Sequence, residues 1–340
     1  MGRIPFLACW LLISVLVIST GVGAQSGKVV IYSALDSTVT TEVLKAFERQ
    51  SGLKTEALTL AAAGTLATRI RAESARPQAD IFLGGSVDFH APLAKDGLLV
   101  PYLSPRLAEA KLAKEFYDPA GSWYGWYIGA LGIMYNRTRF EKEVAPTGVK
   151  APANWDDLLN PAYKGQIVLP SPITTGGGFI FMATQIFRLG NEDRAFAWLK
   201  QLAANATFTP TAPAPITLVS RGEALVGMNW GHDIRAMAIN QGFPVELVFP
   251  PDTATELGAA SIIKGGPNPQ GAQQFIDFML GRLPQDINAK FGLRYPTRPD
   301  APVPLGMPAL STLRFVKYDR QWAIDNMMRL RDRWQREIGK

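Results

Sequence analysis

The chain has 340 residues, of which 47% are hydrophobic and 19% are charged, a composition typical of a globular protein long enough for two lobes with separate cores. Its one cysteine, Cys9, lies in the apolar N-terminal stretch, which excludes disulfides, thiolate metal sites and cysteine nucleophiles from residues 25–340. The net charge of +6 is compatible with an anionic ligand or with solubility alone, and we expect no nucleic-acid binding because no basic patch with aromatic residues is present.

Residues 1–24 have the pattern of a secretory signal peptide. Arg3 comes first, an apolar run covers residues 6–18, and the small residues 22–24 provide a cleavage site before residue 25. The apolar run is too short and wrongly flanked for a transmembrane helix, and it continues beyond Cys9, unlike a lipid-attachment site. We therefore expect the mature protein to be exported to the periplasm.

The first part of the mature chain alternates between strand and helix patterns. Apolar runs predict strands at residues 28–33, 53–60 and 80–83, and amphipathic stretches predict helices at residues 39–51, 64–74 and 89–96. This order predicts a three-layer α/β unit around a parallel sheet. Ligands of such sheets bind beyond the carboxyl ends of the strands, so the loops at residues 33–37 and 84–88 are either binding edges or ordinary turns.

Two extended segments predict a second lobe. Residues 123–136 are rich in aromatic and β-branched side chains and are typical of a long strand that passes from one lobe to another, and residues 245–263 contain further strands for a return. We predict lobe 1 at residues 25–125 and 255–310 and lobe 2 at residues 126–254. The C-terminal segment, residues 311–340, contains one long basic amphipathic helix at residues 320–338, and its lobe is not indicated.

The stretch QIVLPSPITTGGGFIFMATQIFRL, residues 166–189, predicts a strand, a glycine-rich turn and a helix in that order. The first N–H groups of a helix lack internal partners and lie at the positive end of its dipole, so this turn is a candidate anion site. Thr174 or Thr175 would add a hydroxyl donor, and Gly176 and Gly177 would leave the backbone accessible. The alternative is an ordinary helix capped by threonine.

The rest of the second half offers no catalytic constellation. A buried strand at residues 224–228 is followed by Asn229, Trp230, Gly231, His232 and Asp233, and then by a helix at residues 234–241. The sequence contains no nucleophile elbow, Walker loop, paired zinc ligands or dinucleotide fingerprint. Neighbours in sequence do not establish a catalytic dyad, so His232 and Asp233 give no reason to expect an enzyme.

Several stretches together resemble periplasmic solute-binding proteins of ABC importers. They are KVVIYSALDSTVTTEVLKAFERQSG, PQADIFLGGSVDFHAPLAKDGLLVPY, WYGWYIGALGIMYNRTRF, PSPITTGGG, GGPNPQGAQQFIDFML and FGLRYPTRPDA. The resemblance covers nearly all of the mature chain and is greatest to the ferric-iron-binding branch, whose relatives include binders of phosphonates and other organophosphates. It implies two α/β lobes, joined by two β-strand crossovers, that close on a ligand and deliver it to an inner-membrane permease.

The resemblance fails where iron ligands would be expected. Ferric members carry an adjacent tyrosine pair where this chain has Trp230-Gly231, often a histidine where it has Ala34, Leu35 and Asp36, and a glutamate where it has Gly85 and Ser86. Indole, glycine and serine do not supply the anionic oxygens that suit Fe(III). The turn that holds a synergistic anion in the family, by contrast, matches residues 174–177. We therefore predict no metal ligands and no cofactor.

These observations lead to one preferred hypothesis and three alternatives. The preferred ligand is a phosphonate, organophosphate or similar anion, gripped by residues 174–177 and Ser86, with a hydrogen bond from Asn229, an apolar wall at Trp230, and an amine partner at Asp233 or Asp36. Core packing for Trp230 and helix capping for Asp233 are the plainer readings. The alternatives are a ferric or metal-complex binder, a periplasmic enzyme, and a binder of another small anion. We expect a monomer whose partners are the solute and the permease.

Overall fold

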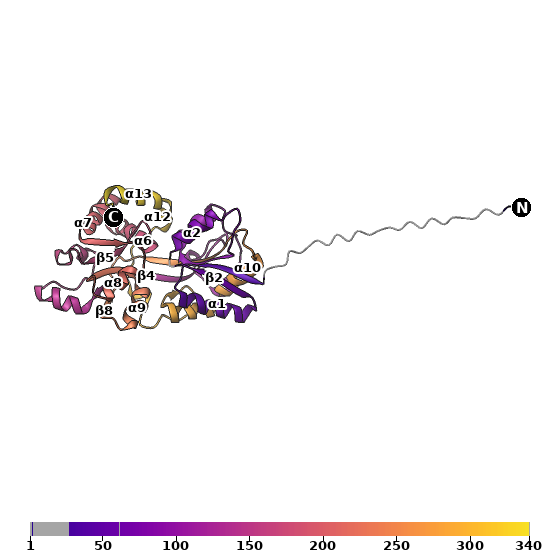
Figure 1. Cartoon of the computed structure of the whole chain (residues 1–340), viewed down its shortest axis with the longest axis horizontal. Coiled ribbons are helices and arrows are strands. Elements are labelled where there is room, and N and C mark those ends of the chain that lie inside the picture. The colour runs from indigo at the N-terminus through magenta and orange to yellow at the C-terminus, as the bar shows by residue number, and fades with distance from the viewer. Residues whose placement is uncertain (1, 3–26, 61, 340) are drawn as a thin grey trace.

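The computed structural model describes residue 2, residues 27–60 and residues 62–339. Figure 1 shows two lobes side by side, with the C-terminal helices above one of them. The predicted signal peptide lies outside the described residues. Within the described residues, every helix is too short or too polar to cross a bilayer.

One sheet runs through both lobes in the order β2-β1-β3-β9-β4-β7-β5-β6, and β8 and β10 also pair with β4. In chain order the strands are β1 (Lys28–Ser33), β2 (Lys54–Thr59), β3 (Ile81–Ser86), β4 (Tyr124–Asn136), β5 (Ile167–Pro170), β6 (Ala206–Thr209), β7 (Val226–Trp230), β8 (Val245–Val248), β9 (Thr255–Ile262) and β10 (Tyr295–Pro296). The pairs β1–β2, β1–β3, β5–β6 and β5–β7 are parallel, as expected for strands connected by helices.

Strand β4 belongs to both lobes. Its first part, Tyr124 to Ala130, pairs with β9 and β10, and its second part, Leu131 to Asn136, pairs with β7 and β8. Strand β9 carries the chain back and lies antiparallel to both β3 and β4. The predicted fold class, two α/β lobes joined by a β-strand hinge, is confirmed. The residue boundaries of the lobes stay a prediction.

Helices cover both faces of the lobe 1 sheet. They are α1 (Ser37–Ser51), α2 (Ala63–Ala72), α3 (Val87–Lys95), α10 (Pro269–Met279) and α11 (Arg282–Ile287), with the short α4 (Leu107–Ala110) in a connection. Figure 1 shows α2 on one side of the strands and α1 on the other. Phe47, Trp126 and Phe275 are buried between α1, α10 and the sheet. Their removal from water is the main stabilising contribution to this lobe.

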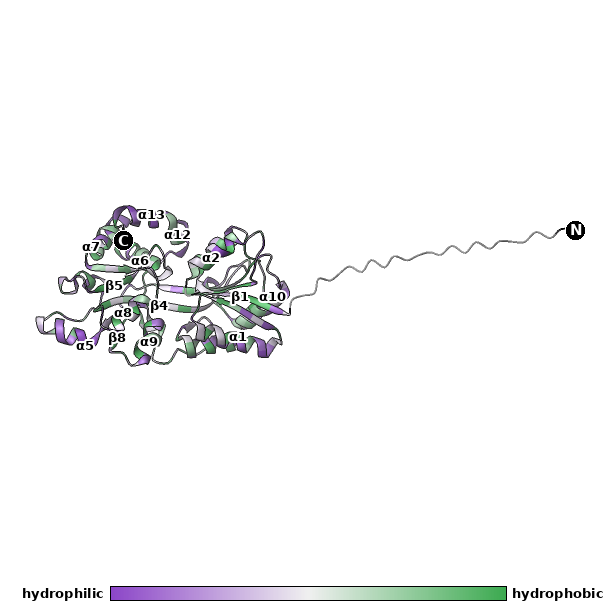
Figure 2. Ribbon diagram, viewed as in Figure 1, coloured by the Kyte–Doolittle hydropathy of each residue, from purple (hydrophilic) through white to green (hydrophobic). Residues whose placement is uncertain are grey.

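Lobe 2 is built in the same way around its own core. Its helices are α5 (Arg137–Arg139), α6 (Gly176–Leu189), α7 (Glu192–Asn205), α8 (Ala214–Ser220) and α9 (Gly231–Met237). Figure 2 shows apolar residues along the strands of this lobe, whereas α5 is hydrophilic. Trp155, Phe181 and Trp198 pack together in this core. Each lobe thus has its own core, and the strands of the hinge connect the two lobes.

The C-terminal segment differs from the prediction of one continuous helix. It forms α12 (Arg320–Asp325) and α13 (Met327–Glu337), separated at Asn326, where ψ is 2°. The Asn326 side chain donates to the carbonyl oxygen of Trp322, a local bond that competes with helix continuation. Trp334 is fully buried in the lobe 2 core and contacts Phe208 edge to face. The segment therefore packs on lobe 2.

Candidate ligand-binding cleft

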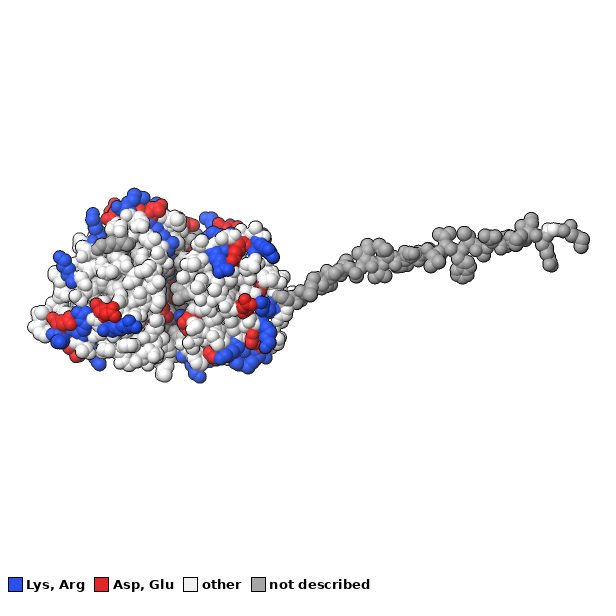
Figure 3. Space-filling model, viewed as in Figure 1, with Lys and Arg blue, Asp and Glu red and all other residues white. Residues whose placement is uncertain are grey.

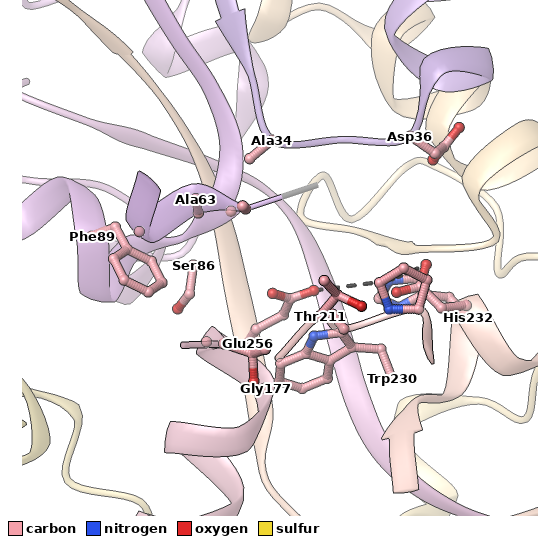
Figure 4. Close-up of a pocket in the computed structure, with 18 of the residues that line it drawn as sticks. Ala34, Asp36, Ala63, Ser86, Phe89, Gly177, Thr211, Trp230, His232 and Glu256 are labelled. Carbon is pink, nitrogen blue, oxygen red and sulfur yellow. Dashed lines mark ion pairs between the residues drawn. The ribbon is translucent and has the colours of Figure 1, made fainter. Parts of the chain in front are cut away.

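A cleft lies between the two lobes and is lined by residues of both. Figure 3 shows the groove that separates the lobes, and Figure 4 shows side chains that line the cleft. One end is formed by the beginnings of helices, which we call the anion end. The other end, which we call the charged end, holds side chains with ionisable groups, namely Asp36, His232, Asp233, Glu256 and Arg294.

On lobe 2, the anion end is the first turn of α6. The N-cap residue Thr175 accepts a hydrogen bond from the N–H of Gly178 at 3.1 Å, and Gly176 and Gly177 line the cleft. The hydroxyl of Thr175 donates to the Ser171 carbonyl oxygen at 2.7 Å, and that of Thr174 donates to the Pro210 carbonyl oxygen at 2.8 Å. The threonine hydroxyls thus hold the turn, and its backbone N–H groups are the donors left for an anion.

On lobe 1, the anion end includes the first turn of α2, which the sequence did not single out as a site. Its N-cap is Ala62, which has no side chain able to cap the helix, and Ala63 and Gly64 line the cleft. The sequence did contain a signal for this site, because the predicted helix begins after alanines and not after Ser, Thr, Asp or Asn, the residues that cap a helix. Uncapped N–H groups at a helix start bind anions for the same reason as those of α6.

The β3 turn completes this end. Gly85 has a φ of +75°, and a Cβ there would lie 2.4 Å from the Cβ of Ala63, so the turn fits against α2 only because residue 85 is glycine. Ser86 caps α3, and its hydroxyl donates to Oδ2 of Asp88 at 2.7 Å. As with the threonines, the Ser86 hydroxyl is engaged inside the protein. The N–H of Gly85 donates to the Tyr127 hydroxyl at 3.2 Å.

The charged end is organised around Arg294, whose side chain is 6% exposed. Its guanidinium donates to Asp36 of lobe 1 at 3.1 Å and to Asp233 of lobe 2 at 3.4 Å, and it lies over the ring of Tyr127. The Nε2 atom of His232 lies 3.4 Å from Asp233 and 3.8 Å from Glu256. Within the described chain, Nδ1 of His232 and Nε of Arg294 are buried without a hydrogen-bond partner. Such atoms favour a polar ligand in the adjoining space.

Burial changes the protonation of this cluster. It raises the pKa of Glu256 to about 8, against the opposing charge of Arg294, so that Glu256 carries a proton at pH 7. Burial likewise raises the pKa of Asp233 to about 6, and Arg294 limits the rise. Burial lowers the pKa of His232 well below its ordinary range, and Arg294 lowers it further. Glu256 can therefore donate a hydrogen bond, whereas Asp233 accepts.

Trp230 forms an apolar wall of the cleft. Core packing was the alternative role considered for this residue from the sequence. The side chain is mostly buried, lies parallel to the ring of His232, and approaches α6 closely enough that a Cβ at Gly177 would be 3.3 Å from Nε1. Both descriptions apply, because Trp230 is buried in the lobe 2 core and also lines the cleft. An indole offers contact area and one N–H donor to a ligand.

Ten of the twelve predicted site residues line the cleft, namely Ala34, Asp36, Gly85, Ser86, Thr174, Thr175, Gly176, Gly177, Trp230 and Asp233. Leu35 does not, because its side chain is buried against Gly84 in the lobe 1 core. Asn229 does not either, since its amide donates to the Ala212 carbonyl oxygen and accepts from the N–H of Trp230. Leu35 and Asn229 are thus buried next to residues that line the cleft.

The sequence did not point to Glu256 and Arg294 of the charged end, or to Tyr127 beside them. Glu256 is a single acid in the otherwise apolar strand β9, and this contrast was the available signal. Arg294 precedes the two-residue strand β10, and Tyr127 lies in the long segment that was assigned to the hinge. Among the described residues, no group of three or more His, Cys, Asp or Glu side chains is placed to hold a metal ion.

Two lobes on a β-strand hinge, with a polar cleft between them, define a solute-binding protein. Residues 76–321 match the family described as bacterial extracellular solute-binding protein, and the chain belongs to this family. The predicted resemblance is confirmed, and the family consists of proteins that bind solutes.

Individual relatives and solved structures are similar to the chain over most of its length. The periplasmic binding protein AfuA from Actinobacillus pleuropneumoniae, whose structure has exogenous fructose-6-phosphate bound, is 32% identical, with a TM-score of 0.84 over 92% of this chain and 98% of AfuA. An uncharacterised protein of Haemophilus influenzae is 30% identical over 94% of this chain and 93% of its own length. Iron-bound HitA from Pseudomonas aeruginosa, at 21% identity, shares the fold, with a TM-score of 0.78 over 90% of this chain and 98% of HitA.

Proposed function

We propose that this protein is the periplasmic substrate-binding component of an ABC importer and that it captures a small phosphorylated polyhydroxy solute, such as a hexose phosphate. It binds the solute between its lobes as a monomer, without chemical change, and delivers it to an inner-membrane permease. The observation that carries the proposal is the convergence of two helix starts, α2 from lobe 1 and α6 from lobe 2, on one end of the cleft.

The charged end supports a hydroxyl-bearing solute over an amine. Asp36 and Asp233 are already paired with Arg294, so a ligand ammonium would have to compete with a buried guanidinium. A sugar hydroxyl both donates and accepts, which suits carboxylates that accept and a protonated Glu256 that donates. The charged end therefore suits a sugar phosphate better than an aminophosphonate, and the similarity to AfuA supports the same ligand class.

Binding measurements on residues 25–340, refolded from denaturant to remove retained solute, test the proposal. Calorimetry and thermal shift would compare fructose 6-phosphate with fructose, inorganic phosphate, 2-aminoethylphosphonate and ferric citrate. We expect the sugar phosphate to bind most tightly, because it occupies both ends of the cleft. Tight binding of ferric citrate or 2-aminoethylphosphonate, with none of the sugar phosphate, would show that the proposed ligand class is wrong.

A matched pair of variants tests the anion end. Ala63→Pro removes one N–H at the first position of α2, where proline is tolerated, and should weaken sugar-phosphate binding about tenfold or more. Thr174→Ala removes a hydroxyl that donates to Pro210, so it should change the affinity much less. Equal effects of the two variants would contradict the assignment of the backbone N–H groups as the anion donors.

A further inference from the structure

The ring of Phe89 is wedged between two glycines that belong to different lobes. A Cβ at Gly64 of α2 would lie 3.3 Å from Cε1 of Phe89, and a Cβ at Gly176 of α6 would lie 3.0 Å from Cε2. The Phe89 side chain is 9% exposed and lines the cleft. Since each glycine lies in the first turn of its helix, the ring stands directly beside the first-turn N–H groups of both helices.

The ring thus closes one end of the cleft. In Figure 4, Phe89 and Ser86 lie on one side of the drawn side chains and His232 on the other, with Glu256 and Trp230 between them. An anion held by α2 and α6 would have the charged end on one side and an aromatic ring on the other. A phenyl ring offers an oxygen substituent no hydrogen-bond donor and no free space.

We propose that Phe89 is a specificity-determining residue that restricts the cleft to solutes ending in their anionic group. This inference rests on the proposed function and names the ligand class more closely. A phosphate monoester has one organic substituent, which extends toward the charged end. A phosphodiester carries a second substituent on the phosphorus, and the Phe89 ring fills the place that this group needs. The cleft therefore accepts monoesters and rejects diesters.

The position of Phe89 between the two lobes makes the exclusion of a second phosphate substituent strong. Phe89 belongs to a buried cluster of lobe 1 that includes Leu66, Ile70 and Leu93, so the ring cannot retreat without opening that cluster. Gly176 belongs to lobe 2, and its contact with the ring exists only when the lobes are together. A bulky group at this position would therefore hold the lobes apart and weaken every other contact in the cleft, a larger effect than one lost hydrogen bond.

The experiment compares fructose 6-phosphate with its methyl phosphodiester by calorimetry, using the refolded chain, Phe89→Ala and Phe89→Leu. We expect the wild type to prefer the monoester by about a hundredfold or more, which corresponds to about 2.7 kcal/mol. Phe89→Ala should reduce the preference to about tenfold or less through tighter binding of the diester, and Phe89→Leu should give an intermediate ratio. Phe89→Leu removes less apolar volume than Phe89→Ala, so it allows the test to be made if the alanine variant does not fold.

Leu93→Ala serves as the matched control. Leu93 is fully buried in the same cluster, but the atoms that a Cβ at Gly64 or Gly176 would meet belong to Phe89. It should lower the melting temperature and leave the monoester-to-diester ratio unchanged. A ratio in Phe89→Ala and Phe89→Leu equal to that of the wild type overturns this inference alone, and so does a wild type that binds both esters equally. A wild type that binds neither ester, but binds another solute class, overturns the proposed function and this inference with it.

Discussion

The guanidinium of Arg320 donates to the carboxylate of Asp88 at 3.2 Å, joining the C-terminal helix α12 to α3 of the opposite lobe. It also donates to the carbonyl oxygen of Thr255 in the hinge strand β9, at 3.1 Å. The Asp88 side chain is 1% exposed and also accepts from Ser86, which lines the cleft. A segment packed on lobe 2 therefore supplies the countercharge for a buried carboxylate of lobe 1.

Separation of the lobes would take this countercharge away from Asp88. A buried carboxylate that loses its partner is strongly destabilised, so the pair favours the arrangement in which the lobes are together. Arg320→Met, which keeps the apolar stem, should weaken sugar-phosphate binding about tenfold, mainly by faster dissociation. Stopped-flow dissociation rates and the radius of gyration of the ligand-free protein in solution would measure both effects.

Arg329→Met is the control for this prediction. Arg329 lies on α13 and pairs with Glu192 of α7, so both partners belong to the same lobe. It should change stability slightly and leave the dissociation rate as in the wild type. Identical dissociation rates for Arg320→Met and the wild type would show that the Asp88–Arg320 pair has no part in closure.

A second prediction concerns the protonation of Glu256. Its pKa is raised to about 8, first by burial and then by Asp233 and Asp88, with Arg294 and Arg320 opposing. As the pH rises from 7 to 9, Glu256 loses its proton and adds a negative charge to the cleft that we propose to bind an anion. Affinity for the sugar phosphate should therefore fall over this range, by about tenfold, and Glu256→Gln should bind with little pH dependence. Calorimetry from pH 7 to 9.5 measures this.

The same shift has a consequence for folding. Because the folded pKa of Glu256 lies above its ordinary value of 4.5, the folded state binds the proton more tightly than the unfolded chain. The contribution of Glu256 to the free energy of unfolding of the ligand-free protein should therefore fall as the pH rises from 4.5 through about 8, so that the wild type loses stability relative to Glu256→Gln over this range. Glu246→Gln, at an exposed carboxylate paired with Arg137, is the control and should keep both pH dependences. A fall in affinity that persists unchanged in Glu256→Gln would assign it to another group.

Much of the fold follows from local patterns in the sequence. Alternating strand and helix periodicities predicted the β1–α3 unit, and the many aromatic and β-branched side chains of residues 123–136 predicted a strand that passes between lobes. The single helix predicted at residues 320–338 was wrong, because a local bond of Asn326 outweighs a continuous amphipathic pattern. Local patterns also left open where the C-terminal segment packs, which depends on the fit of Trp334 against Phe208, two residues far apart in the chain.

The two ends of the cleft differed in how well they could be predicted. The anion end of α6 is encoded in one contiguous stretch, so residues 174–177 were found together. The charged end assembles Asp36, Asp233, Glu256 and Arg294 from four distant parts of the chain, and Arg294 is placed by the pairing of Tyr295 with Ile128. Long-range strand pairing has no local signature, so Arg294 was missed. Leu35 and Asp36 were predicted together, although adjacent residues point in different directions.

A third prediction uses the glycine at the start of α6. Gly176→Ala places a Cβ 3.0 Å from the Phe89 ring of the other lobe, whereas Gly64→Ala places one 3.3 Å from the same ring within lobe 1. Gly176→Ala should therefore weaken ligand binding about tenfold without loss of thermal stability in the ligand-free protein, because its clash arises only on closure. Gly64→Ala should affect stability and affinity together. Calorimetry and thermal unfolding would separate the two, and the reverse pattern would contradict closure against Phe89.

A fourth prediction concerns His90, which is fully buried and links α3 to two strands. Its Nδ1 lies 2.6 Å from the hydroxyl of Ser261 in β9, its Nε2 lies 3.0 Å from the carbonyl oxygen of Gly84 in β3, and its ring stacks on Phe82. Burial lowers the pKa of His90 from 6.5 to about 4, so the unfolded chain binds more protons between these values. The contribution of His90 to the free energy of unfolding should thus fall by about 3 kcal/mol as the pH decreases from 6.5 to about 4, with no further loss below pH 4. His90→Phe keeps the stacking and should be less stable at pH 7, by about 2 kcal/mol, but should lose less stability in acid. Urea unfolding of both proteins from pH 4 to 7 measures the difference, and parallel curves would show that protonation of His90 is not the cause.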